Sequence, residues 1–279
     1  MIVFSWTVEE HIPHLEEVFG LLSRAGVSLK ASKCFLFQEE AEYLGHIVGR
    51  GHVRVKEKNL VGLGRAEPFR TKKDLRSFLG MCNMYRRFVN DYAQVARPLT
   101  ALTGPKVSDP LSPFSQDQRD AFEELKRRLT SSRILALPRS TGANVLDTDA
   151  NDDQVGCVLT QEQPDKTCKP VGYWSRPIAG AEKNYRTTEK ECLALVWALF
   201  MLRPYVQGTR FIVRTDHSAL RWMLHMDGAH GSLARWQLRL SEFDYLVATR
   251  AGAAHHAADT MSRLATPAVD TRPIPEEIP

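Results

Sequence analysis

Acidic side chains are concentrated in the stretch "NVLDTDANDDQ", residues 144 to 154. Four aspartates lie within seven positions, and two of them, Asp147 and Asp149, alternate along a run typical of a β-strand. A solvated turn is one interpretation, because Asp and Asn favour turns. A site for divalent cations is the other, because Mg²⁺ prefers carboxylate oxygens. The stretch by itself does not decide between them.

Further acidic positions fall where strands end or helices begin. Asp216 closes the strand-like run "RFIVRTD", Asp259 lies near the start of the last predicted helix, and Glu189 and Glu191 lie near the start of a long apolar helix. Ligand sites gather at strand ends in α/β sheets, and a helix packed across the sheet can bring its first turn over them. Such carboxylates suit two cations about 3.5–4 Å apart, which support phosphodiester cleavage.

Pattern alone leaves the ligand set open. Asp147 and Asp149 fall on the same side of a strand, so alternation does not select one of them. Glu191 stands three residues after Thr188, which is the spacing of a capping box, and the apolar helix gives no preferred face. Asp259 is equally explained as an acidic residue that the helix dipole favours.

The elements that must position these residues follow from apolar periodicity. Three strands with short connections come first, and helices and strands then alternate, which indicates an α/β domain with a mixed sheet. The predicted strands span 144–149, 154–161, 169–178, 210–216 and 245–251, and the predicted helices span 188–206, 218–224, 232–243 and 255–264.

The first half of the chain predicts helices and one hairpin. A helix over 7–26 has Thr7 and Glu10 at capping-box spacing and Gly26 as its stop. Two β-prone runs surround Gly49–Gly51, which indicates a hairpin. A helix over 71–89 carries an apolar stripe, and a Pro- and Gly-rich boundary at 103–113 precedes a helix over 117–132. The stripe consists of Leu75, Phe78, Leu79, Cys82, Tyr85 and Val89.

Charge is spread unevenly, although the net charge is only +4. Residues 51–100 hold eleven Lys or Arg against four Asp or Glu, an excess of seven, which suggests a polyanion partner. An ordinary solvated surface is the alternative. Lys73 and Arg76 lie off the apolar stripe of the helix over 71–89, and Gly80 interrupts its polar side, where a nucleic-acid backbone could approach.

Other features narrow the class of protein. The longest apolar run, residues 192–202, is too short to span a bilayer, and the start lacks the basic region and cleavage site of a signal peptide. Five scattered cysteines predict reduced thiols and no zinc site. We therefore expect an intracellular protein, in a cytoplasmic particle or the nucleus, that is neither secreted nor membrane-bound.

Five ordered blocks resemble the ribonuclease H domain of reverse transcriptases from gypsy-type, Metaviridae-like long-terminal-repeat retrotransposons. They are "LDTDAND…VGCVLTQ", "NYRTTEKECLALVWAL", "FIVRTDHSALRWML", "LARWQLRLSEFDY" and "AADTMSRL". Upstream, "AEYLGHIV" lies in a segment similar to the end of the palm and the primer-grip hairpin. "TKKDLRSFLGMCNMYRRFV" is similar to the thumb, and "DQRDAFEELKRRL" is similar to the connecting segment.

The resemblance implies a fold and a division of the chain. The expected fold is α/β, a ribonuclease H-like mixed five-stranded sheet flanked by helices, preceded by a small α+β or helical thumb-like segment. The expected segments are 1–66 (end of palm and hairpin), 67–104 (thumb-like), 105–139 (linker and connecting helix), 140–265 (ribonuclease H-like) and 266–279 (disordered tail).

It also implies an activity and a ligand set. The family pattern selects Asp149, Glu191, Asp216 and Asp259 as catalytic ligands of two Mg²⁺ ions, with Mn²⁺ able to substitute, and leaves Asp152 and Asp153 to the hairpin turn. The expected activity is cleavage of the RNA strand of RNA–DNA hybrids, with hybrid and duplex nucleic acid as partners. The residues expected to bind nucleic acid are Lys73, Arg76, Arg87, Tyr185 and Arg186.

Departures of this chain from the family pattern leave alternative functions open. The polymerase Tyr-x-Asp-Asp box is absent from these 279 residues, so we expect no DNA synthesis. Ala251, Ala253 and Ala254 stand where relatives usually carry proline and polar residues. The alternative function is a non-catalytic nucleic-acid-binding remnant of a decayed or domesticated retroelement. A structural fragment that folds poorly is a third reading.

Overall fold

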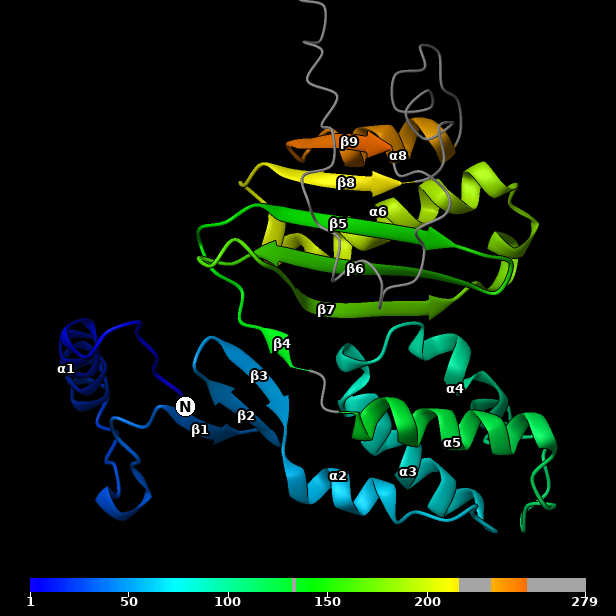
Figure 1. Cartoon of the computed structure of the whole chain (residues 1–279), viewed down its shortest axis with the longest axis horizontal. Helices are drawn as coiled ribbons and strands as arrows, with labels where there is room; N and C mark the ends of the chain where they lie inside the picture. The colour runs from blue at the N-terminus through cyan, green and yellow to red at the C-terminus, as the bar shows by residue number, and fades with distance from the viewer. Residues whose placement is uncertain (132–133, 216–231, 250–279) are drawn as a thin grey trace, which may run out of the picture.

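The computed structural model describes residues 1–131, 134–215 and 232–249, and two β-sheets organise them (Figure 1). The first sheet has the order β1-β2-β3-β4 and the second has the order β7-β6-β5-β8-β9. Within the described ranges, no helix combines the length and apolarity needed to cross a membrane. The helices expected over 218–224 and 255–264 and the tail 266–279 lie outside the described residues.

The N-terminal segment contains one long helix and the first sheet. The helix begins as predicted, because Thr7 Oγ1 accepts a hydrogen bond from the Glu10 N–H at 3.2 Å, and Gly26 follows its end with φ +69°. The hairpin at Gly49–Gly51 is confirmed. Strand β4, which comes after α5 in the chain, pairs with β3 and completes the sheet. The elements are α1 (Val8–Arg24), η1 (Ala31–Lys33), β1 (Glu40–Tyr43), β2 (His46–Gly49), β3 (His52–Val55) and β4 (Leu135–Ala136).

Residues 57–130, which we call the helical unit, pack around a separate apolar core. Its elements are α2 (Glu57–Gly64), α3 (Lys72–Met84), η2 (Arg86–Phe88), α4 (Tyr92–Ala101) and α5 (Gln116–Thr130). The Phe78 ring of α3 lies 5.0 Å from the Phe122 ring of α5, centroid to centroid. The expected boundary between residues 104 and 105 therefore runs through one shared core.

The helix expected over 71–89 is shorter than predicted. Thr71 caps its start as expected, but α3 ends at Met84 and a 3₁₀ turn follows. Tertiary contacts account for the early end: the Tyr85 hydroxyl donates to the Gly45 carbonyl at 3.1 Å, and Arg86 donates to the Ser175 carbonyl. Tyr85 and Val89 remain buried, as the stripe predicted.

The second sheet is mixed and five-stranded, as expected. Strands β7, β6 and β5 are antiparallel, whereas β5, β8 and β9 are parallel. Helix α6 lies across one face of the sheet (Figure 1). The elements are β5 (Asn144–Ala150), β6 (Gln154–Glu162), β7 (Cys168–Pro177), η3 (Gly180–Asn184), α6 (Thr187–Val206), β8 (Phe211–Thr215), α8 (Ser232–Leu240) and β9 (Tyr245–Thr249).

Burial explains why α6 is apolar nearly all round. Leu195 and Leu199 are fully buried in a core with Leu146 of β5 and Val213 of β8, and Trp236 of α8 joins the same core. A helix that is covered on more than one side needs no polar face. The packing fixes α6 against β5, which sets where the start of the helix lies relative to the end of that strand.

The helical unit docks on β7, the edge strand of the second sheet (Figure 1). Tyr173 of β7 is buried in the core of the helical unit. The guanidinium of Arg87 lies 4.9 Å from the centre of the Trp174 ring and donates to the Tyr205 hydroxyl at 3.1 Å. Apolar burial and these polar contacts join the two parts, so the edge of β7 is covered.

Candidate active site at the end of strand β5

Asp147 belongs to an ion pair inside the sheet. Arg214, on the neighbouring parallel strand β8, donates to both carboxylate oxygens of Asp147, with Nε–Oδ1 at 2.8 Å and Nη2–Oδ2 at 2.5 Å. The Arg214 side chain is 9% exposed and that of Asp147 is 20% exposed. A bidentate pair of this kind is among the strongest side-chain hydrogen-bonding arrangements. Asp147 therefore links β5 to β8.

Asp149 is exposed at the penultimate position of β5. It pairs in register with Gly156 of β6, so both positions point to the same face of the sheet. Asp91 of the helical unit lies on that face, since its Oδ1 would stand 3.6 Å from a Cβ placed on Gly156. Burial, followed by the negative charge of Asp149, raises the pKa of Asp91.

The turn between β5 and β6 is closed by Asn151. Its Oδ1 accepts hydrogen bonds from the N–H groups of Asp153 and Gln154, both at 2.9 Å. Asp152 and Asp153 lie in this turn, as expected, but their carboxylates reach other elements. Asp152 Oδ1 lies 2.7 Å from the Lys190 ammonium of α6, which lowers the pKa of Asp152, and Asp153 pairs with Arg97 of α4.

The start of α6 separates the roles of its two glutamates. Glu189 Oε2 accepts from the Arg186 N–H at 2.8 Å, so Glu189 performs the helix-start role that Glu191 was suspected of. Glu191 is 5% exposed. Its neighbour Lys190 holds the turn that follows Asp149, so the start of α6 lies beside the end of β5. The ligand role of Glu191 stays a prediction.

The structure does not describe the two remaining predicted ligands. Asp216 and Asp259 lie outside the described residues, and β8 ends at Thr215, the residue before Asp216. Since β5 and β8 are parallel, their ends meet at the same edge of the sheet. Across residues 1–131, 134–215 and 232–249, no three His, Cys, Asp or Glu side chains gather into a metal-binding group. The four-ligand set stays a prediction.

The residues expected to bind nucleic acid have different surroundings. Lys73 and Arg186 are exposed, and Arg76 is exposed while donating to the Thr103 carbonyl at 2.9 Å. Tyr185 is half-buried, with its ring 5.8 Å from that of Trp236. Arg87, expected on the thumb-like helix, lies in η2 and its guanidinium faces the protein interior. Its position favours a docking role over a phosphate contact.

Much of the basic excess in residues 51–100 has partners within the protein. Arg54 pairs with Glu40 at 2.9 Å, Lys56 pairs with Glu42 at 2.6 Å, and Arg97 pairs with Asp153. These three carboxylates lie outside the segment, so they were not counted in its excess of seven. Lys72 also donates to a backbone carbonyl oxygen. The field available to a polyanion is therefore weaker than the segment's composition suggests.

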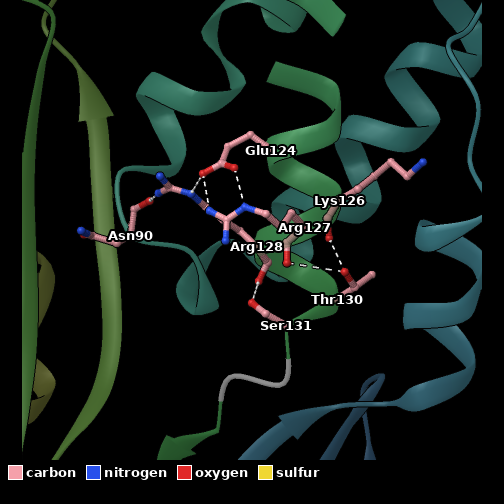
Figure 2. Close-up of polar contacts among 7 residues, drawn as sticks. All are labelled: Asn90, Glu124, Lys126, Arg127, Arg128, Thr130 and Ser131. Carbon is pink, nitrogen blue, oxygen red and sulfur yellow. Dashed lines mark hydrogen bonds and ion pairs between the residues drawn. The ribbon is translucent and has the colours of Figure 1, made fainter. Parts of the chain in front are cut away.

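A hydrogen-bonded network that sequence patterns did not predict joins α5 to the segment before α4. Figure 2 shows Glu124 of α5 between Arg127 and Arg128, and Arg128 reaching the Asn90 carbonyl, with Nη1–O at 2.6 Å. Arg128 also acts to lower the pKa of Asp91, against burial. Arg128 and Asn90 are separated by 38 positions, so no local spacing could have indicated the contact.

We expect this network to make the folding stability of the protein fall at acidic pH. The hydrogen bond from Arg127, together with that from Arg128, lowers the pKa of Glu124 from 4.5 to about 2. Because the folded-state pKa is depressed, the stabilisation is fully present above pH 4.5 and is lost as the pH falls toward about 2. In urea titrations across this window, Glu124→Gln should lose less stability than the parent.

Glu123→Gln is the matched control for this prediction. Glu123 is adjacent on α5, its ion pair with Lys126 is long at 3.5 Å, and its side chain is 65% exposed. The control variant should therefore follow the parent's acid dependence. Parallel acid profiles for the parent and Glu124→Gln would contradict the assignment.

Comparison with known proteins gives a consistent answer. Residues 140–243 match the RNase H-like domain found in reverse transcriptase. The chain is 34% identical over 95% of its length to the retrovirus-related Pol polyprotein from transposon 297 of Drosophila melanogaster. It is 33% identical over 99% of its length to the transposon Tf2-3 polyprotein of Schizosaccharomyces pombe. The chain spans only 24% and 21% of these polyproteins.

Solved structures agree on the fold. The foamy viral protease-reverse transcriptase in complex with RNA/DNA hybrid matches with a TM-score of 0.72 and 19% identity, covering 99% of this chain and 36% of that chain. The foamy viral protease-reverse transcriptase dRH in complex with double-stranded DNA matches with a TM-score of 0.71 and 20% identity, covering 88% of this chain and 44% of that chain. Together with the family match over residues 140–243, these likenesses establish an RNase H-like fold. Residues 140–243 therefore form an RNase H-like domain of the kind found in reverse transcriptase, and the chain is similar over nearly its whole length to part of transposon Pol polyproteins.

Proposed function

We propose that this chain is a metal-dependent endoribonuclease that cleaves the RNA strand of RNA–DNA hybrids. The observation that carries the proposal is the placement of Asp149. It is an exposed carboxylate at the end of β5, and the Lys190–Asp152 pair links the start of α6, which carries Glu191, to the turn that follows this strand. The related foamy viral enzyme has been captured with an RNA/DNA hybrid, which supports the choice of substrate.

The donor set fits hard divalent cations. Asp149 and Glu191 offer carboxylate oxygens, which suit Mg²⁺, with Mn²⁺ as a substitute. The companion aspartates at this edge, Asp147 and Asp152, are paired with Arg214 and Lys190. Two Mg²⁺ ions, when bound, would activate the attacking water and stabilise the leaving oxygen. Asp216 and Asp259 complete the proposed set.

A hybrid-cleavage assay on the purified full chain tests this function. We expect endonucleolytic products from the RNA strand with Mg²⁺ or Mn²⁺, and no products after chelation with EDTA. A DNA duplex of the same sequence, in which no RNA strand is present, should remain intact. Hybrid binding without cleavage under both metals would favour the alternative of a non-catalytic binding module.

We also expect Lys73 and Arg76 to contribute sequence-independent affinity for duplexes. Each phosphate neutralised lowers log K by roughly 0.7–0.9 per log unit of salt. Lys73→Gln combined with Arg76→Gln should therefore reduce the salt slope of hybrid binding by roughly 1.4–1.8 if both contact phosphates. Titrations at several salt concentrations measure this change.

Arg54→Gln is the control for charge removal alone. Arg54 also lies in the basic segment, but Glu40 holds its guanidinium at 2.9 Å. Its replacement should change the salt slope less than a single phosphate contact would. Equal slopes for the parent and the Lys73/Arg76 double variant would remove this face of α3 from the binding surface.

A further inference from the structure

Gln154 joins the turn after Asp149 to the helical unit. Its side chain is buried, at 3% residue exposure, and it contacts α4 and the cap of that helix. Gln154 Oε1 accepts from the Gln94 N–H at 3.0 Å. Its Nε2 donates to Asp91 Oδ1 at 3.0 Å and to Gln94 Oε1 at 3.3 Å. The backbone of Gln154 also closes the turn with Asn151.

The N-terminus of α4 is capped from the other part of the protein. Asp91, the N-cap residue, has a left-handed backbone with φ +53° and its side chain makes no cap hydrogen bond. The N–H of Ala93 instead donates to Ser175 Oγ at 3.0 Å, and the N–H of Gln94 donates to Gln154. The first N–H groups of a helix need such partners. Two residues of the RNase H-like domain therefore complete α4.

We propose that α4 positions Asp149 through Gln154. This inference rests on the proposed function. Only Asn151, Asp152 and Asp153 separate strand β5 from Gln154, and Asp149 pairs with Gly156, two residues beyond Gln154. A shift of Gln154 must therefore move the end of the β5–β6 ladder. Arg97 holds Asp153 of the same turn, which strengthens the connection from α4.

Gln154 is a positioning residue in this account, since its buried amide contacts the helical unit. The helical unit is then part of the nuclease centre, although its own residues need not touch the hybrid. Docking strength alone is the competing explanation. A positioning role predicts that a local change at Gln154 alters the Mg²⁺ dependence of cleavage. A role in docking alone predicts an unchanged Mg²⁺ dependence, because weaker docking only lowers the fraction of folded, active protein.

Gln154→Glu with an Asp91→Asn rescue separates these explanations in the full chain. The introduced carboxylate would face that of Asp91 across the present 3.0 Å contact, and the repulsion should displace the turn. Asp91→Asn restores a donor toward the introduced carboxylate, while the Gln94 N–H can still donate to it. Ser175→Ala is the matched control, because it removes the neighbouring cap on α4 without altering the β5–β6 turn.

We expect Gln154→Glu to lower kcat for hybrid cleavage by about 10- to 100-fold, as a small misplacement of a catalytic group does. It should also raise the Mg²⁺ concentration needed for half-maximal rate, with KM for the hybrid unchanged. The double variant should recover both quantities. Ser175→Ala should reduce stability and leave the Mg²⁺ dependence as in the parent. An unchanged Mg²⁺ dependence in Gln154→Glu would overturn the proposal.

Hydrogen exchange of the amides in residues 149–156, without substrate, provides a second readout. Gln154→Glu should lose protection there and the double variant should regain it. If the parent cleaves no hybrid, the proposed function fails, and exchange alone then judges whether α4 holds the strand end at Asp149. Unchanged protection in Gln154→Glu would overturn the positioning role even if the parent is active.

Discussion

Replacing Asp149 with Asn, or Glu191 with Gln, is expected to lower Mg²⁺-dependent hybrid cleavage by more than about 100-fold. Loss of a group that only supports a metal ligand typically costs about 10–100-fold, so loss of a ligand itself should exceed this range. Both substitutions are nearly isosteric. Asp149 is exposed and its charge opposes ionisation of Asp91, so its neutralisation should not destabilise the fold.

The controls for this prediction share chemistry with the tested residues. Glu189→Gln makes the same change two residues earlier on α6, and glutamine can still accept the Arg186 N–H. Asp165→Asn changes an aspartate of the β6–β7 turn, which lies at the other end of β6 from the site. The asparagine keeps an oxygen acceptor for Thr167. Both controls should cleave at nearly the parent rate. Parent-like cleavage by the Asp149/Glu191 double variant would refute the site.

The second large effect concerns stability. Arg214→Met should lower the free energy of unfolding by about 3–5 kcal/mol, because it removes the cation from a largely buried pair with Asp147. Urea denaturation of the full chain, followed by circular dichroism, measures the loss. The cost arises from a partly buried carboxylate that loses its bidentate cation, rather than from lost apolar contact.

A double variant tests the origin of that loss. Asp147→Leu with Arg214→Met replaces both charges by apolar side chains, and buried pairs replaced in this way are often nearly neutral in stability. The double variant should therefore be more stable than Arg214→Met alone. Additive losses from the two single changes would indicate that packing, and not the uncompensated charge, determines the cost.

Local features of the sequence sufficed for many element boundaries. Thr7 and Thr71 cap their helices as predicted, and Gly49–Gly51 forms the hairpin, because these signals act within a few residues. The order of strands and helices in residues 144–249 was enough to predict a mixed α/β sheet. The family resemblance expected over residues 140–265 rests on ordered blocks, and it is confirmed for residues 140–243.

The tertiary structure decided what each acidic residue does. In sequence, Asp147, Asp149, Asp152 and Asp153 are one acidic cluster; in the fold, three of them pair with Arg214, Lys190 and Arg97. Those cations come from β8, α6 and α4, distant in the chain, so no periodicity could assign them. Arg87 is a similar case: the family resemblance implied a nucleic-acid contact for it, and in the fold its guanidinium packs against Trp174. Charge type is local information, whereas the partner of a charge depends on which elements the core brings together.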